Sequence, residues 1–354
     1  MLLVVACGLQ SSSSLNGTMC LNAIASDEVK TNLEQIVDRF TKHSGPLTSV
    51  LVRDACSKQI YRRGSYRIVI YRAGSAGMLL FVRGYAEPDH GDLTPDEASK
   101  CLARAKQDLI EIGVGADVLD TYRKRNGDTM DDPDIGPAHF LNCSGAGALS
   151  YERSLSLMVH EVTHLNTQGN CLYTSYEPQY LCFALSGDLP TSSIATVEQL
   201  FDSDDPYLKK LSEAQRLYLF QFNKTNRGPG ALFNELNAYI AGLEVSEALL
   251  KKNGPKGLVD KEGKPEPQML PLVMLWTAKY LNEMRNENAD LYASAFGPAT
   301  DNRENVETLL TWGENVYEHW SAQLADHKLS ANSSELAIWQ QYLDAKKQLE
   351  APAP

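Results

Sequence analysis

Apolar residues recur at two different periods along this chain, and the periods divide it into two parts. Between residues 58 and 83, short β-rich runs alternate with turn-forming residues, which is typical of hairpins. These runs cover 58–62, 66–71 and 78–83 and predict a small antiparallel sheet. From Pro206 onward, apolar residues recur every three or four positions, which predicts helices. We expect them at about 207–224, 230–252, 268–287, 302–326 and 334–349.

The stretches on either side of the β-rich runs contain further helical patterns. Residues 28–42 have apolar positions at helical spacing, and residues 95–112 begin with a capping box from Thr94 to Glu97 and end at Gly113. We also expect an edge strand at 139–142 and a helix at 150–166. Residues 167–206 contain many turn-forming residues and are expected to be loop-rich.

Composition limits the classes to which the protein can belong. The 354 residues are 43% hydrophobic and carry a formal net charge of −12, which is typical of a globular protein and unfavourable for binding nucleic acid. No internal run is long and apolar enough for a membrane span. An acidic loop at 124–137 lacks the spacing of a calcium-binding EF-hand. Motifs of serine hydrolases and nucleotide-binding proteins are absent from the sequence.

The first residues resemble the lipobox of bacterial lipoproteins. An apolar run, Leu2 to Ala6, ends in a small residue and is followed by Cys7, and a serine-rich stretch follows. The resemblance implies a lipid anchor at Cys7, although only six residues precede it, fewer than a signal peptide needs. The chain has seven cysteines, so lipidation of Cys7 would leave an even number for an oxidising compartment. Among these we expect a bridge between Cys171 and Cys182.

The candidate chemistry lies in residues 157–165, LMVHEVTHL, which contain the motif HExxH. On a helix, His160 and His164 project from one face and can bind one zinc ion. Glu161 lies about 100° around the helix, beside the metal, where a general base would take a proton from water. The metal then needs a third protein ligand.

The third ligand is expected on a later helix, because the residues after His164 do not place a third histidine at the spacing of HExxHxxGxxH. Glu235 is the leading candidate, in a helical pattern whose small residues allow close approach to another helix. Glu244 and Glu247 are alternatives.

HExxH followed by a helix with the pattern NExxA, here Asn234 to Ala238, resembles the gluzincin metallopeptidases. The resemblance covers about fifteen residues. It implies that His160, His164 and Glu235 bind one zinc ion per chain and that Glu161 is the catalytic base.

One position departs from that family's pattern. Several gluzincins have an aspartate three or four positions after the ligand glutamate, where it orients a ligand histidine, whereas this chain has Ala238 and Tyr239. Asn234, Asn237 or an aspartate in 202–205 could take over this task. A donor for the developing oxyanion is also needed. We expect Tyr239 in this role, although core packing is an alternative for it, and the other candidates are Tyr173, Tyr176, Arg227 and His319.

Together these patterns predict an α+β, zincin-like fold. Residues 1–26 would be a signal remnant and linker, 27–166 a subdomain whose small sheet packs on the HExxH helix, and 167–350 a mainly helical subdomain supplying Glu235. The expected activity is zinc-dependent hydrolysis of peptide or protein substrates by a protein of the bacterial cell envelope, attached to the membrane only through Cys7, or secreted. The alternative is a non-catalytic envelope lipoprotein that binds a partner and has a structural or degenerate metal site.

Overall fold

The fold was obtained as a computed structural model of the full chain. It describes residues 2–4, 49–53, 56–63, 66–73, 77–83, 95–126, 130, 136–143, 150–185, 189, 229–260, 262–265 and 268–350. The helices predicted at 28–42 and 207–224, and the aspartates of the acidic loop, lie outside these residues. So do Cys7 and Arg227.

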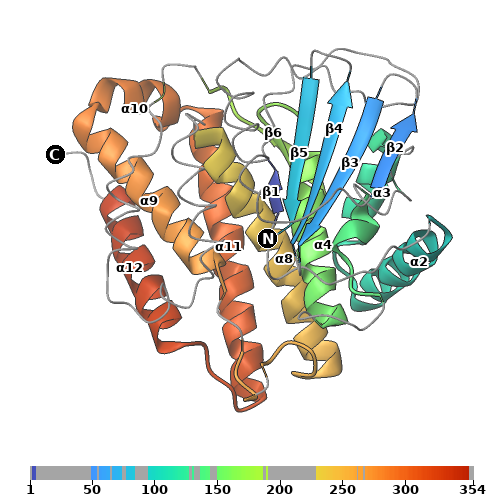
Figure 1. The fold of residues 1–354 in the computed structure, drawn as a ribbon. Coiled ribbons are helices and arrows are strands. Elements are labelled where there is room, and N and C mark those ends of the chain that lie inside the picture. The colour runs from blue at the N-terminus through green and yellow to red at the C-terminus, as the bar shows by residue number, and fades with distance from the viewer. Residues whose placement is uncertain are drawn as a thin grey trace. The chain divides into compact units, whose positions relative to one another are not determined.

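Two compact units make up the chain: Met1–Gly91 with Ala146–Leu149, and Asp92–Gly145 with Ser150–Pro354. The first contains a five-stranded antiparallel sheet in the order β1-β5-β4-β3-β2 (Figure 1). Its strands are β1 (Leu2–Val4), β2 (Ser49–Arg53), β3 (Cys56–Arg63), β4 (Tyr66–Ala73) and β5 (Gly77–Arg83). The three strands predicted from the hairpin signals correspond to β3, β4 and β5, and β1 and β2 were not predicted.

The second unit is mainly helical and contains the HExxH helix together with the C-terminal helices (Figure 1). Its elements in chain order are α2 (Pro95–Ile112), α3 (Ala116–Asn126), η2 (Pro137–Phe140), α4 (Tyr151–Asn166), β6 (Cys171–Thr174), β7 (Gln179–Cys182), α8 (Pro229–Asn253), α9 (Leu270–Glu287), α10 (Ala289–Phe296), α11 (Asp301–Asp326) and α12 (Ser333–Glu350). The α+β class is therefore confirmed. Among the described residues, no helix combines the length and apolar character that crossing a membrane requires.

The predicted helix boundaries agree closely with α2, α4, α8, α9, α11 and α12. Two shorter helices were missed. In α3, buried Val118, Leu119 and Tyr122 form only a short apolar stripe on a polar helix, and α10 has just eight residues. In so short a segment the apolar period has too few repeats to stand out.

The edge strand predicted at 139–142 is wrong. Residues Pro137–Phe140 form a 3₁₀ turn, and all four are buried. Proline fixes φ near −65° and is favoured at the first helical position, which turns the chain here. A short apolar run does not by itself distinguish a strand from a buried helical turn.

The segment 167–206 was expected to be loop-rich, but it begins with a hairpin. Strands β6 and β7 pair antiparallel with Cys171 opposite Cys182, and these two cysteines form the predicted disulfide. A second bridge joins Cys101 of α2 to Cys143. Both bridges tie down segments that connect to α4, so they help to fix the surroundings of the HExxH helix.

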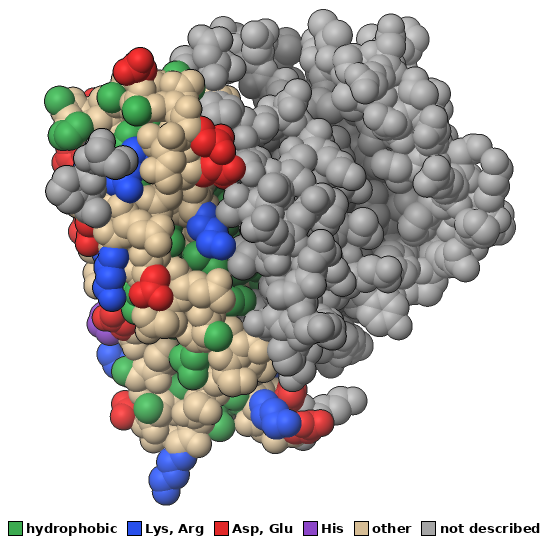
Figure 2. Space-filling model, turned by 90° about the vertical axis from the view of Figure 1, so that its left-hand side faces the viewer, with side chains coloured by type: hydrophobic (Ala, Val, Ile, Leu, Met, Phe, Trp, Pro, Cys, Tyr) green, Lys and Arg blue, Asp and Glu red, His purple; other side chains and the backbone are tan. Residues whose placement is uncertain are grey.

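On the face shown in Figure 2, acidic, basic and hydrophobic side chains are intermixed over the described residues.

Candidate metal centre

Helix α4 carries two of the three candidate ligands and is anchored at both ends. Ser150 caps its N-terminus by accepting a hydrogen bond from the backbone of Arg153. At the other end, the side chain of Asn166 donates to the carbonyl of Val118 in α3 at 2.9 Å. Leu155, Met158, Val159 and Val162 are fully buried and hold the helix in the interior. His160 and His164 therefore project from a rigid helix.

Helix α8 carries the third candidate ligand and packs closely against α4. Its small residues make this possible: a Cβ added at Gly242 would lie 3.2 Å from the Cβ of His160 and 3.3 Å from the carbonyl oxygen of Ser156. Two hydrogen bonds join the helices. The Ser156 hydroxyl donates to the Gly242 carbonyl at 2.6 Å, and the Ser246 hydroxyl donates to that of Ser156 at 3.0 Å. This contact brings Glu235 opposite the two histidines.

Potential donor atoms of His160, His164 and Glu235 all lie within 4.8 Å of one another. The Nε2 atoms of the two histidines are 3.2 Å apart, and Nε2 of His164 lies 3.5 Å from Oε1 of Glu235. Two ligands about 2.0–2.1 Å from a tetrahedral zinc ion are separated by about 3.4 Å. Both of these separations therefore match those between two ligands of such an ion.

Electrostatics also favour a cation between these groups. Burial and the nearby charge of His164 lower the pKa of His160, so its imidazole is neutral. Burial also disfavours the charged form of His164, but the carboxylates of Glu235 and Glu161 outweigh this and raise its pKa. The cluster holds two imidazole nitrogens facing one point and a buried carboxylate, a donor set that suits zinc.

Each histidine is also held by a group from α8. The side chain of Asn234 hydrogen-bonds to His164 and accepts a hydrogen bond from the hydroxyl of Thr167 at 2.8 Å. The backbone of Ala238 hydrogen-bonds to His160. Such outer contacts fix the tautomer and ring orientation of a ligand histidine. Of the groups that the sequence suggested in place of an aspartate, Asn234 lies against His164, and His160 has a backbone partner.

Glu161 and Tyr239 lie beside the cluster. Glu161 is half-buried, and its charge reaches both His164 and Tyr239, whose pKa values it raises. The ring of Tyr239 packs edge-on against that of His160 with the centroids 4.4 Å apart. Burial, and then Glu235, raise the pKa of Tyr239, so its hydroxyl keeps its proton.

The other sequence candidates lie elsewhere in the structure. Glu244 accepts a hydrogen bond from Ser175 at 3.2 Å and, like Glu247, is not part of the donor cluster. The Tyr173 hydroxyl donates to Asp117 at 2.6 Å, and the Tyr173 carbonyl accepts from Asn237 at 2.7 Å.

Tyr176 and His319 also have other surroundings. The ring of Tyr176 lies 5.6 Å from that of Trp312, and His319 is exposed on α11. Arg227 and the aspartates in 202–205 are outside the described residues.

Two groups that contact the cluster's inner surroundings were not predicted from the sequence: Thr167, which bonds to Asn234, and the backbone of Ala238, which bonds to His160. Thr167 follows directly after the HExxH helix, so its place at the helix end was a usable signal. A backbone group has no sequence signal.

Comparisons of the chain with protein-family models, with curated proteins and with solved structures found no match.

Proposed function

We propose that the protein is a zinc-dependent metallopeptidase of the gluzincin type with a zincin-like arrangement of its site. The observation that carries the proposal is the convergence of His160, His164 and Glu235 at spacings that suit one zinc ion. When bound, zinc would polarise the scissile carbonyl and lower the pKa of a coordinated water.

The chain's own residues supply the remaining chemistry. His160, His164 and Glu235 hold the ion, and Asn234 together with the Ala238 backbone keep the two imidazoles in orientation. Glu161 takes the proton from the attacking water and later delivers it to the leaving amine. Tyr239 retains its proton and can donate a hydrogen bond to the developing oxyanion.

The number of ligands separates this proposal from a purely structural metal site. A structural zinc ion normally has four protein ligands, whereas a catalytic one has three and an open position. Within the described residues, the cluster contains three. The side chain of His164 is 17% exposed, so the cluster is not sealed from solvent.

Substitution of the proposed base tests the function. Purified protein should contain about one zinc ion per chain and cleave members of a broad peptide library. Glu161→Gln should retain the zinc and lose hydrolysis by about 100-fold or more, because a general base contributes roughly 10²–10⁴-fold. Glu152→Gln, the same substitution on the same helix, is the matched control and should leave hydrolysis unchanged.

Three outcomes would count against the proposal. Wild-type protein without zinc after growth and dialysis with excess metal would exclude the site. Hydrolysis that survives Glu161→Gln would exclude the assigned base. Zinc binding without hydrolysis in any wild-type assay would favour the alternative, a partner-binding lipoprotein. The lipid anchor at Cys7 and the envelope location stay predictions.

A further inference from the structure

Four helices of the second unit surround a cavity of about 270 Å³ whose lining includes no residue of α4 or α8. The cavity lies among α9, α10, α11 and α12. Most of its inner wall is apolar and comes from Leu281, Phe296, Val306, Leu310 and Leu349. Pockets that bind small molecules typically combine such a wall with a few placed polar groups.

Tyr292 brings the first polar group to this wall. The residue is only 9% exposed and lines the cavity. Its ring packs against Phe296, and no hydrogen bond from its hydroxyl to another described residue is found. Burial raises the pKa of Tyr292 although the charge of Arg303 opposes this, so the hydroxyl is a proton donor. The Tyr292 hydroxyl can therefore donate a hydrogen bond to a ligand in the cavity.

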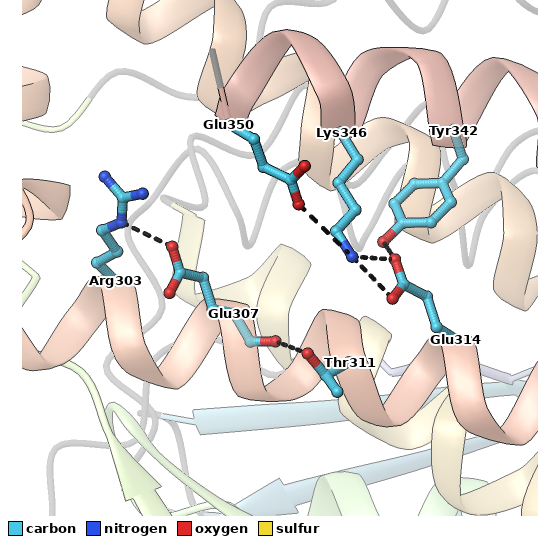
Figure 3. Close-up of polar contacts among 7 residues, drawn as sticks. All are labelled: Arg303, Glu307, Thr311, Glu314, Tyr342, Lys346 and Glu350. Atoms are coloured by element: carbon cyan, nitrogen blue, oxygen red, sulfur yellow. Dashed lines mark hydrogen bonds and ion pairs between the residues drawn. The ribbon is translucent and has the colours of Figure 1, made fainter. Parts of the chain in front are cut away.

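Arg303 and Glu307 bring one charge of each sign. The Nε of Arg303 donates to Oε1 of Glu307 at 2.7 Å. Figure 3 shows both side chains extending from α11 toward α12, with only this one bond drawn between them. A guanidinium has five N–H donors. Arg303 therefore keeps donors, and Glu307 keeps an oxygen, for a ligand at the cavity.

Lys346 is already neutralised. It donates to both oxygens of Glu314 at 2.6 and 2.8 Å and lies 3.8 Å from Glu350 (Figure 3). Glu350, which also lines the cavity, is 62% exposed and shares Lys346 as its ion partner. The remaining charged side chains of the lining are those of Arg303 and Glu307. A purely anionic ligand would be repelled by Glu307, and a purely cationic one by Arg303. A ligand carrying both charges matches the pair.

We infer that this cavity binds a free α-amino acid with an apolar side chain. The carboxylate would lie at Arg303 and the Tyr292 hydroxyl, the ammonium at Glu307, and the side chain against the apolar wall. A cavity of about 270 Å³ has room for a molecule of the size of leucine. This inference does not rest on the proposed peptidase activity.

Three related probes test the charge requirement by calorimetric titration of the full chain. L-leucine carries both charges, 4-methylpentanoic acid lacks the ammonium, and 3-methylbutylamine lacks the carboxylate. We expect L-leucine to bind and each of the other two to bind at least about tenfold more weakly, because charge-assisted hydrogen bonds are lost. Equal binding of the acid would overturn the inference in favour of a simple carboxylate site. Absence of L-leucine binding would overturn it outright.

Two variants then test the assigned groups. Arg303→Gln and Tyr292→Phe should each weaken L-leucine binding by about tenfold or more, while their thermal unfolding confirms a folded chain. Lys100→Gln is the control, since Lys100 forms a comparable i,i+4 pair with Asp96 on an exposed helix face. Unchanged affinity in both variants would contradict the site. Tyr292→Phe removes only a hydroxyl and should fold. Its affinity for L-leucine therefore still tests the site if Arg303→Gln does not fold.

Discussion

At the scale of single residues, the candidate metal centre depends on groups that do not themselves bind the metal. Asn234 lies between Thr167 and His164. Its side chain accepts a hydrogen bond from the threonine hydroxyl and forms another with the imidazole. If the ligand histidine is held in one tautomer by this contact, the lone pair on Nε2 stays directed at the metal.

Replacing Asn234 should weaken the metal site without unfolding the protein. We expect Asn234→Ala to lower zinc affinity by about 10–100-fold, the usual effect of losing such an outer contact. Competition with a chromophoric chelator measures this. Asn305→Ala is the control, because Asn305 donates to the carbonyl of Cys182 at 2.9 Å and does not touch the cluster. Equal affinities of the two variants would show that Asn234 does not orient His164.

Gly242 sets how closely α8 approaches α4. An alanine there normally stabilises a helix by about 1 kcal/mol. Here its Cβ would press on the Cβ of His160 at 3.2 Å and on a backbone carbonyl at 3.3 Å, neither of which can rotate away. Overpacking costs about 1–3 kcal/mol, so the steric cost should exceed the gain in helix propensity.

We therefore expect Gly242→Ala to lower the free energy of unfolding by up to about 2 kcal/mol and to weaken zinc binding. Urea denaturation and chelator competition measure the two effects. Lys251→Ala, at an exposed position of the same helix, should change neither. A more stable Gly242→Ala variant would show that the two helices can move apart without cost.

At the scale of elements, the two disulfides stabilise segments around α4. The bridge from Cys171 to Cys182 closes a hairpin with a sequence separation of 11, and the one from Cys101 to Cys143 has a separation of 42. Longer closed loops restrict the unfolded chain more. The second bridge should therefore contribute more to stability than the first.

Removing each bridge by a double cysteine-to-alanine substitution tests this order. On the chain-entropy account, we expect losses of about 3 kcal/mol for Cys171 with Cys182 and about 4 kcal/mol for Cys101 with Cys143. Urea denaturation of each double variant beside the wild type measures them. The opposite order would mean that folded-state contacts, and not loop length, determine the effect.

At the scale of the whole molecule, one buried carboxyl couples global stability to pH. Glu335 is 1% exposed at the start of α12, where its oxygens accept from the backbone of Gln268 at 3.0 Å and from the Tyr317 hydroxyl at 2.9 Å. Burial raises its pKa to about 7 in spite of these two bonds. The folded state therefore binds this proton more tightly than the unfolded chain, where the pKa is about 4.3.

The sign of the pH effect follows from this difference. The contribution of Glu335 is fully present below about pH 4.3 and is lost as the pH rises to about 7, a change on the order of 4 kcal/mol. The Glu335→Gln variant lacks this titrating group, so its free energy of unfolding should not show this loss of stability between about pH 4.3 and 7. The difference in unfolding free energy between wild type and variant should therefore change over that range. Urea denaturation between pH 4.5 and 8 measures it, with Glu318→Gln as the exposed control. A pH-independent difference would contradict the assignment.

Much of the second unit could be predicted from the sequence. The helices containing His160 and Glu235 were predicted because their apolar residues recur regularly over many turns, so the core-facing side is unambiguous. Three of the five strands in the sheet followed from hairpin signals. The bridge from Cys171 to Cys182 was also predicted, although the hairpin that pairs these residues was not.

By itself, the sequence determined that His160 and His164 share one helix face, because side chains four positions apart project from the same side of a helix. It left Glu235, Glu244 and Glu247 open as third ligand, since all three occur in the same helical pattern. Only the tertiary structure shows that Glu235 is the one that lies with the two histidines, through the close contact of α4 and α8 at Gly242. The rotation of one helix against another depends on side-chain packing between segments distant in sequence. Packing among α9, α10, α11 and α12 likewise forms the cavity beside Arg303 and Tyr292, which no local pattern indicated.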